Sequence, residues 1–237
     1  MARALANAGA SAVFSYAGRT GSPLPQPLPV RIGGFGGIAG LADYLRTQHI
    51  THVVDATHPF AAGMSRNAIA ACNEVGVQLL AIERRPWQPI AGDNWVQVAD
   101  MPAAVGALPR DPKTVFLSIG RSQLQDFAAA PQHHYLLRFI DEAETPLPFP
   151  NASVVIARGP FEPAADLSLM REHGIEWLVT KNAGGKAASA KLGAARALGV
   201  PVIMVERPHI PARKTVAGVA EAMEWLGLAH DSVRLGV

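Results

Sequence analysis

Residues 177–205 read WLVTKNAGGKAASAKLGAARALGVPVIMV, and this stretch decides the class of fold. The apolar run Trp177–Thr180 has the composition of a strand that is buried on both faces, and Val202–Val205 repeats it. Between them, Lys186–Leu198 reads as an amphipathic helix. A strand, a helix and a second strand in this order predict two parallel strands that are joined by a right-handed crossover.

The same alternation extends over nearly the whole chain and predicts an α/β fold with mainly parallel sheets. Further predicted strands are Ala12–Tyr16, His52–Ala56, Gln78–Ile82, Trp95–Val98, Val115–Ile119, Tyr135–Phe139 and Val154–Ala157, with a very short one at Val30–Ile32. Further predicted helices are Ala2–Ala8, Ile38–Thr47, Pro59–Val75, Pro102–Leu108, Gln123–Ala129, Ala164–His173 and Val216–Leu226.

Two irregular stretches interrupt this pattern. Glu83–Asn94 is rich in turn-forming residues, and we predict a domain boundary there that divides the chain into residues 1–93 and 94–237. Asp141–Asn151 holds three prolines among acidic residues and reads as a surface excursion.

Composition excludes several classes of protein. In 237 residues, 49% are hydrophobic and 17% are charged, which is ordinary globular usage, and the formal charge of +2 gives no nucleic-acid footprint. The single cysteine, Cys72, excludes an internal disulfide and a zinc site of several thiolates, and its helical spacing from apolar residues predicts a buried, inert thiol. With no predicted membrane span or signal peptide, we expect a cytoplasmic protein.

Cations follow all but one of the strand ends that we compared. Ligands bind at the carboxyl ends of strands in open parallel sheets, so these cations and the glycines beside them predict a ligand with several carboxylates or phosphates. The cationic residues are Arg19, Arg84, Arg85, Arg121, Arg138, Arg158, Lys181 and Arg207. The run from Lys181 to Gly185 precedes a helix and fits either an anion site or a plain connection that needs left-handed backbone.

A glycine-rich run, Gly33–Gly37, satisfies the G-x-G-x-x-A pattern of a dinucleotide site from Gly34 onward, with Asp55 at the spacing of a ribose-binding acid. Its context differs from that of a Rossmann turn, and we interpret it as a loop that brings backbone close to a ligand. No acid lies between Ser15 and Arg19, so a bound dinucleotide would be NADPH rather than NADH.

An acid, a hydroxyl and an imidazole meet at the strand-to-helix turn of Asp55, Thr57 and His58. A histidine here often serves only as a cap, but the neighbouring groups make it a candidate proton donor near neutral pH. The sequence offers no Ser/His/Asp hydrolase elbow and no cluster of metal ligands.

Six segments in this order resemble the precorrin-6A reductase (cobalt-precorrin-6A reductase) family of cobalamin biosynthesis. They are residues 15–19, 31–37, 54–61, 83–87, 118–121 and 180–185, of which Asp-Ala-Thr-His-Pro-Phe at 55–60 is the most specific. The resemblance implies two Rossmann-like domains, an active site in the cleft between them, and NADPH-dependent reduction of one double bond of precorrin-6A to give precorrin-6B.

One feature departs from the family's pattern. Its members begin with a strand and a Gly-Gly-Thr loop that lead into the first helix, whereas this sequence begins within that helix at Met1. We therefore expect that roughly a dozen residues are absent, through a late assigned start, a truncation or a real loss.

The resemblance also implies roles for individual residues. It assigns proton transfer to His58 and Asp55. Cofactor contacts are implied for Ser15, Arg19, Thr20, Gly34, Gly36 and Thr57, and contacts with substrate carboxylates for Arg121, Lys181, Asn182, Gly184 and Gly185. We expect a small tetrapyrrole substrate and no nucleic acid, membrane or metal partner. A tetrapyrrole lyase or cyclase without a nucleotide, and a non-catalytic NADP-binding module, are the alternatives.

Overall fold

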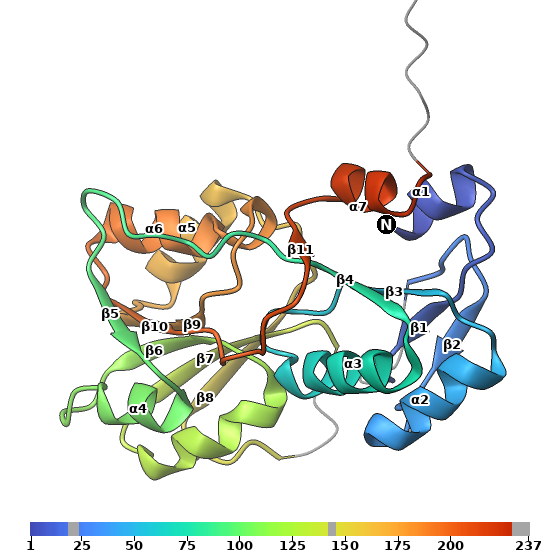
Figure 1. The fold of residues 1–237 in the computed structure, drawn as a ribbon. Coiled ribbons are helices and arrows are strands. Elements are labelled where there is room, and N and C mark those ends of the chain that lie inside the picture. Colours follow the sequence, from blue (N-terminus) through green and yellow to red (C-terminus); the bar gives the residue numbers. More distant parts are fainter. Residues whose placement is uncertain (19–23, 142–145, 229–237) are drawn as a thin grey trace, which may run out of the picture. The chain divides into compact units, whose positions relative to one another are not determined.

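The computed structural model describes residues 1–18, 24–141 and 146–228 (Figure 1). Its strands pair in parallel throughout the described chain, which confirms the predicted α/β fold with parallel sheets. None of the helices in these ranges combines the length and the apolar character that crossing a bilayer requires.

Packing divides the chain into two compact units. Unit 1 comprises Met1–Arg84 and the segment that begins at His209, and unit 2 comprises Arg85–Pro208. The sequence predicted continuous ranges, 1–93 and 94–237, so the structure differs at both the boundary and the C-terminal segment. That segment returns to unit 1 because Thr215–Val216 (β11) pairs with a strand of that unit and Arg213 pairs with Glu83.

Unit 2 contains a six-stranded parallel sheet in the order β5-β10-β9-β6-β7-β8, counted over the described residues. The strands are β5 (Trp95–Val98), β6 (Thr114–Ser118), β7 (His134–Phe139), β8 (Ala152–Ile156), β9 (Trp177–Lys181) and β10 (Val202–Val205). From β6 the chain proceeds to β7 on one side, whereas from β9 it proceeds to β10 on the other. The topological switch point of unit 2 therefore lies between β6 and β9, where ligands bind in open α/β sheets.

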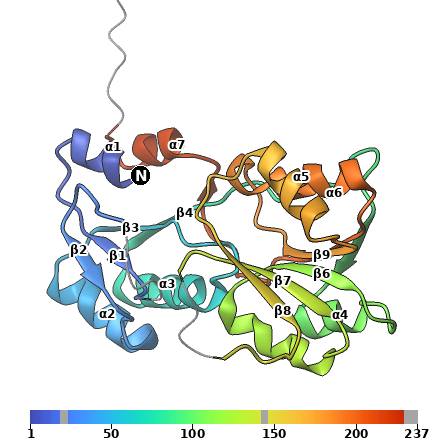
Figure 2. The same ribbon diagram turned by 180° about the vertical axis from the view of Figure 1, so that it is seen from behind.

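Helices cover both faces of this sheet. They are α4 (Met101–Gly106), the 3₁₀ helix η1 (Arg121–Ala129), α5 (Pro163–Glu172), η2 (Lys186–Ala188) and α6 (Ala190–Leu198). Figure 2 shows α5 and α6 together on one face and α4 on the other. Phe116, Leu178 and Met204 are buried in the core beneath α5 and α6, as expected for strands that are covered on both sides.

Unit 1 contains two parallel sheets in its described part. One pairs β1 (Phe14–Tyr16) with β2 (Val30–Ile32), and the other has the order β11-β4-β3, with β3 at His52–Asp55 and β4 at Gln78–Ile82. Its helices are α1 (Ala2–Asn7), α2 (Gly37–Thr47), α3 (Ala62–Val75) and α7 (Val219–Trp225). Helices α2 and α3 pack together around a core that includes Cys72.

Cys72 is buried as predicted, and burial raises the pKa of its thiol to about 11. The nearby negative charge of Asp55 acts in the same direction. A thiol with this pKa stays protonated at neutral pH, which fits the predicted inert role.

Strand boundaries follow the sequence more closely than helix boundaries do. The predicted limits of β4, β5 and β10 are those observed. Helix α3 begins at Ala62 and not at Pro59, because residues 58–61 form a separate turn that is closed by a bond from the Ala61 N–H to the His58 carbonyl. The predicted helix Lys186–Leu198 is broken at Ser189, and β11 occupies the start of the predicted helix Val216–Leu226.

Candidate active site

The loops after β6 and β9 leave the unit 2 sheet at the same level, because Ser118 pairs with Thr180. A Cβ built on Gly120 would lie 3.8 Å from the Lys181 Nζ, so the two loops are in contact. Lys181 donates to the Gln123 Oε1 at 2.9 Å. The switch point of unit 2 thus brings together the two loops that carry Arg121 and Lys181, both predicted to hold substrate.

Further cations lie along the same edge of the sheet. Arg138 is in β7, and Arg158 and Arg207 follow β8 and β10, which places cations at the ends of five adjacent strands. Several also have partners within the protein: Arg158 pairs with Asp141 at 3.5 Å, and the Arg121 guanidinium lies 4.4 Å from the Phe139 ring centre. The predicted gathering of cations is observed along this edge of unit 2, with part of its charge balanced internally.

Gly184 is enclosed by protein. Its φ is +69°, and an added Cβ would lie 2.2 Å from the Arg85 carbonyl oxygen and 2.7 Å from the Arg207 Nη2. Only glycine fits here, because the backbone is left-handed and the Cβ position is already occupied. The open question about this loop is therefore answered in part: Gly184 is required by the packing of unit 2 itself.

Asn182 contacts the Trp87 main chain instead of presenting its side chain outward. Its Oδ1 accepts from the Trp87 N–H at 2.7 Å, and its Nδ2 donates to the Trp87 carbonyl at 3.0 Å. The side chain is buried and both ends of its amide are engaged. This geometry favours a structural role for Asn182, which joins the segment before β5 to the loop after β9.

A buried charged cluster lies behind this loop. Arg138 and Asp166 form an ion pair with both side chains buried, and Lys191 of α6 lies within electrostatic range of both. Burial lowers the pKa of Lys191 to about 8, with a further lowering by Arg138 and an opposing effect of Asp166. Lys191 donates to the Ala188 carbonyl at 2.7 Å and lies 5.2 Å from the Trp87 ring centre.

In unit 1, the Asp55 carboxylate is held by three donors. Its Oδ1 accepts from the N–H of Thr57 at 3.0 Å and from its hydroxyl at 2.7 Å, and its Oδ2 accepts from the Ser65 hydroxyl at 2.6 Å. Asp55 is buried, whereas Thr57 is exposed. Both oxygens of this carboxylate are engaged by donors of the turn and of α3, so the geometry favours a structural role in the turn over proton transfer by Asp55.

His58 lies exposed on the same turn. Its Nδ1 accepts from the Phe60 N–H at 3.2 Å, which requires that Nδ1 carries no proton. In the neutral ring the proton therefore lies on Nε2. His58 in its neutral form therefore carries a ring N–H on a turn that Asp55 holds in place.

The glycine loop of unit 1, residues 33–37, is organised by Arg31. Its guanidinium donates to the carbonyls of Gly33 and Gly34 at 2.6 Å each and lies 3.7 Å from the Phe35 ring centre. It also approaches the Ser15 hydroxyl at 3.5 Å. The structure thus brings Ser15 to the loop that carries Gly34 and Gly36, while Arg19 and Thr20 lie outside the described residues.

Gly34 and Gly36 differ in what the chain requires of them. Gly36 precedes α2 with a left-handed φ of +82°. Gly34 has an ordinary φ, and no heavy atom in residues 1–18, 24–141 or 146–228 would lie within 4 Å of an added Cβ. Nothing within the described part of unit 1 therefore demands glycine at position 34, and the open space fits close approach by a ligand.

Comparison with known proteins identifies the family. The family model described as precorrin-6x reductase CbiJ/CobK matches residues 1–227. The chain belongs to the precorrin-6x reductase CbiJ/CobK family. It is 59% identical over 237 residues to a precorrin-6A reductase of Rhodobacter capsulatus, covering 100% of this chain and 94% of that protein.

Two further similarities extend over most of the chain. A precorrin-6A reductase of Rhodococcus erythropolis is 46% identical over 232 residues, which cover 95% of this chain and 93% of that one. A solved structure described as CobK precorrin-6A reductase has a TM-score of 0.92 at 57% identity and covers 98% of this chain and 93% of its own. The predicted family is therefore confirmed.

Sequence reasoning missed three residues in this member of the precorrin-6x reductase family. Arg31 and Trp87 lie inside the segments that carried the resemblance, but neither was assigned a role, and Lys191 gave no signal at all. A large aromatic residue in a turn-rich stretch and an arginine directly before glycines were the available signals. Lys191 could not have been found, because the charged groups that act on it, Arg138 and Asp166, lie in distant parts of the chain.

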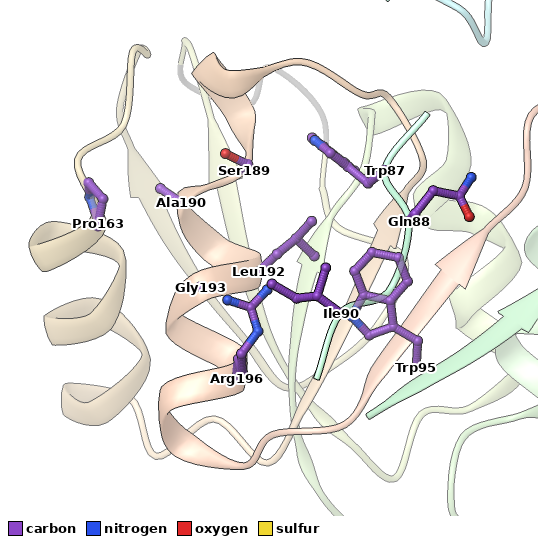
Figure 3. Close-up of a pocket in the computed structure, with 10 residues that line it drawn as sticks. All are labelled: Trp87, Gln88, Ile90, Trp95, Pro163, Ser189, Ala190, Leu192, Gly193 and Arg196. Atoms are coloured by element: carbon purple, nitrogen blue, oxygen red, sulfur yellow. The ribbon is translucent and has the colours of Figure 1, made fainter. Parts of the chain in front are cut away.

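A cavity of about 270 Å³ lies beside Trp87, between the segment before β5 and helix α6 (Figure 3). Trp87, Trp95, Ile90 and Leu192 form much of its wall, and Arg196 pairs with Asp93 at 2.9 Å nearby. None of the predicted site residues lines this cavity. Within the described residues, no group of three or more His, Cys, Asp or Glu side chains is arranged to hold a metal ion.

Proposed function

We propose that this precorrin-6x reductase uses NADPH to reduce one double bond of precorrin-6A, giving precorrin-6B in cobalamin biosynthesis. The protein is an oxidoreductase of the precorrin-6A reductase type. The observation that carries the substrate assignment is the meeting of the Arg121 and Lys181 loops at the unit 2 switch point. A macrocycle with many carboxylate side chains matches cations and backbone amides that are gathered in this way.

We assign the cofactor to unit 1 and the macrocycle to unit 2, each as a Rossmann-like domain. Ser15, Gly34 and Gly36 would contact NADPH, with Arg31 holding the loop, and the vacant space at Gly34 leaves room for the nucleotide. Arg19 and Thr20 remain predictions for the phosphate of the adenosine. When bound, NADPH supplies the hydride, and the residues of the chain position both reactants and supply a proton.

The proton is assigned to His58. The reduction adds a hydride to one atom of the double bond and a proton to the other, while NADPH is oxidised to NADP⁺. We assign the His58 Nε2–H as the proton donor, and the Phe60 N–H that bonds to Nδ1 orients the ring. Asp55 holds Thr57 and Ser65 and thereby fixes the turn.

The substrate carboxylates are assigned to Arg121, Lys181 and the amides of Gly184 and Gly185. Guanidinium groups bind carboxylates through two parallel hydrogen bonds, which orients the macrocycle as well as binding it. Asn182 contributes indirectly by fixing Trp87 beside the loop.

Substrate-dependent oxidation of NADPH tests the proposal, with Arg121→Gln as the decisive variant. We expect the KM for precorrin-6A to rise about tenfold, because the substrate would lose one charged hydrogen-bonding partner. The KM for NADPH should stay unchanged. Arg171→Gln is the matched control, since it removes the same charge from the last turn of α5. This turn leads to the start of β9, away from the carboxyl ends of the strands. Equal effects of the two variants would refute the assignment, as would wild-type protein that does not oxidise NADPH in the presence of precorrin-6A.

A further inference from the structure

Several carbonyl groups of the loop after β9 accept hydrogen bonds from side chains of unit 2, and these bonds hold the loop in place. Arg207 donates from Nε to the Asn182 carbonyl at 2.9 Å and from Nη2 to the Ala183 carbonyl at 3.2 Å. Trp87 donates from its indole Nε1 to the Gly185 carbonyl at 2.9 Å. We call residues 183–188 the amide loop, and most of its carbonyls have a side-chain donor.

Two further donors come from the start of α6. Lys191 donates to the Ala188 carbonyl at 2.7 Å, and the Ser189 hydroxyl donates to the Lys186 carbonyl at 2.9 Å. The donors thus come from the segment before β5, the end of β10 and helix α6. Side chains from three separate parts of unit 2 fix one short loop.

Peptide geometry converts this into an orientation of amides. In a planar trans peptide the carbonyl of one residue and the N–H of the next point in opposite directions. The bond to the Ala183 carbonyl therefore turns the Gly184 N–H away from Arg207, and the bond to the Gly185 carbonyl turns the Lys186 N–H away from Trp87. Among the described residues, neither of these two N–H groups has a hydrogen-bond acceptor.

We propose that Trp87, Arg207 and Lys191 are positioning residues that hold the amide loop so that the N–H groups of Gly184 and Lys186 receive a substrate carboxylate. The inference rests on the proposed function and names the part of the site that sets affinity for the macrocycle. The two N–H groups would then already be oriented for a bound carboxylate. The carbonyl oxygens of the loop would not repel it, because they point toward their own donors.

Trp87 is the best placed of the three to test. Its main-chain N–H and carbonyl both form hydrogen bonds with the Asn182 side chain, so the backbone that carries the indole is fixed in position. Lys191 lies on the other side, 5.2 Å from the ring centre. Phenylalanine at this position would keep an aromatic ring in this setting and remove only the donor to Gly185.

The test compares Trp87→Phe with Trp95→Phe. Both indoles line the same cavity (Figure 3), but the Trp95 Nε1 is buried and has no hydrogen-bond partner among the described residues. Both variants lose an indole N–H, and only one releases the amide loop. We expect Trp87→Phe to raise the KM for precorrin-6A about tenfold, with kcat, the KM for NADPH and thermal stability close to wild type. Trp95→Phe is expected to leave the KM for precorrin-6A unchanged.

A direct binding measurement separates this inference from the proposed reaction. Uroporphyrin, a macrocycle that bears acetate and propionate side chains, serves as the probe, and its fluorescence reports the Kd without turnover. We expect weaker binding by Trp87→Phe and wild-type binding by Trp95→Phe, even if the wild-type protein does not oxidise NADPH. Wild-type affinity in Trp87→Phe, or equal weakening in both variants, would overturn the positioning role.

Discussion

The two glycine loops of this protein look alike in sequence and differ in structure. In unit 1, an added Cβ at Gly34 would have no heavy atom of the described residues within 4 Å. In unit 2, an added Cβ at Gly184 would lie 2.2 Å from the Arg85 carbonyl oxygen. Among the described residues, the space at Gly34 is open, whereas the space at Gly184 is filled with protein. Internal packing therefore requires glycine at position 184, and ligand access is the role that we propose for glycine at position 34.

The two loops also differ in which side chains donate hydrogen bonds to their carbonyl groups. Arg31 alone holds two successive carbonyls of the unit 1 loop, and it comes from the strand directly before that loop. The unit 2 loop is held by Lys191, which is close to it in sequence, and by Trp87 and Arg207, which are distant in sequence. The first arrangement is local, whereas the second requires that unit 2 is already folded.

Gly184→Ala is expected to have the largest effect. A left-handed φ and a clash with main-chain atoms together should lower the free energy of unfolding of unit 2 by about 3 kcal/mol. Because the amide loop would move, precorrin-6A reduction should fall with it. Chemical denaturation followed by tryptophan fluorescence measures the first effect, since Trp87, Trp95 and Trp177 lie in unit 2.

Gly174→Ala is the control for this variant. Gly174 has a similar φ of +56°, but an added Cβ would have no heavy atom within 4 Å. Its substitution should cost only the backbone term, about 1 kcal/mol. Equal destabilisation by the two substitutions would show that Gly184 is not crowded and would end the contrast between the loops.

Gly34→Ala should leave stability unchanged and weaken NADPH binding at least tenfold, or by about 1.4 kcal/mol. The residue has an ordinary φ, so the new methyl group would occupy only the space assigned to the nucleotide. Isothermal calorimetry with NADPH measures the change. Gly63→Ala, on α3 and also in open space, is the control and should leave NADPH affinity at the wild-type value.

Much of the fold could be predicted because parallel strands leave a strong signal. Runs such as Gln78–Ile82 and Val202–Val205 are apolar on both faces, and their observed limits are those predicted. The two-residue strand β11 could not be predicted, since its pairing with β4 depends on a distant segment and not on its own composition. The same limit explains why the C-terminal segment was placed in the wrong unit by continuity alone.

The positions of the candidate site residues followed from the sequence more readily than their contacts did. Parallel topology predicts that the ends of β6 and β9 lie side by side, and Lys181 at the end of β9 does lie beside the segment Gly120–Arg121 that follows β6. Which side chains face inward depends on tertiary contacts. Asn182 bonds with Trp87, and Asp55 bonds with Thr57 and Ser65, although neither partnership has a periodic signature in the sequence.

Arg31→Lys tests how the unit 1 loop is held. Lysine keeps the charge but lacks the planar fork that reaches two carbonyls at once. We expect NADPH affinity to fall about fivefold, less than in Gly34→Ala, since the loop would loosen without being blocked. Arg46→Lys is the control, because Arg46 pairs with Glu74 on the exposed surface of unit 1. An unchanged affinity in Arg31→Lys would mean that the loop holds its shape without Arg31.

The smallest expected effect is that of raising the pH, which should weaken binding at the unit 2 loop and not at the unit 1 loop. Burial lowers the pKa of Lys191, which supports the unit 2 loop, to about 8, so its charge changes between pH 7 and 9. The charged groups that face Lys191 are Arg138 on β7 and Asp166 on α5. Between pH 7 and 9 the KM for precorrin-6A should rise about threefold as the donor to Ala188 loses its charge, with no matching change for NADPH.

The sign of the stability change excludes unfolding as the cause of that rise. The pKa of Lys191 is lower in the folded chain than its ordinary value of 10.5, so between about pH 8 and 10.5 the unfolded chain binds more protons. The contribution of Lys191 to the free energy of unfolding therefore increases with pH, while binding of precorrin-6A weakens. Lys191→Met should start from a higher KM and abolish this part of the pH dependence. A wild-type pH profile that persists in Lys191→Met would assign the titration to another group and leave the unit 2 loop without its pH-sensitive support.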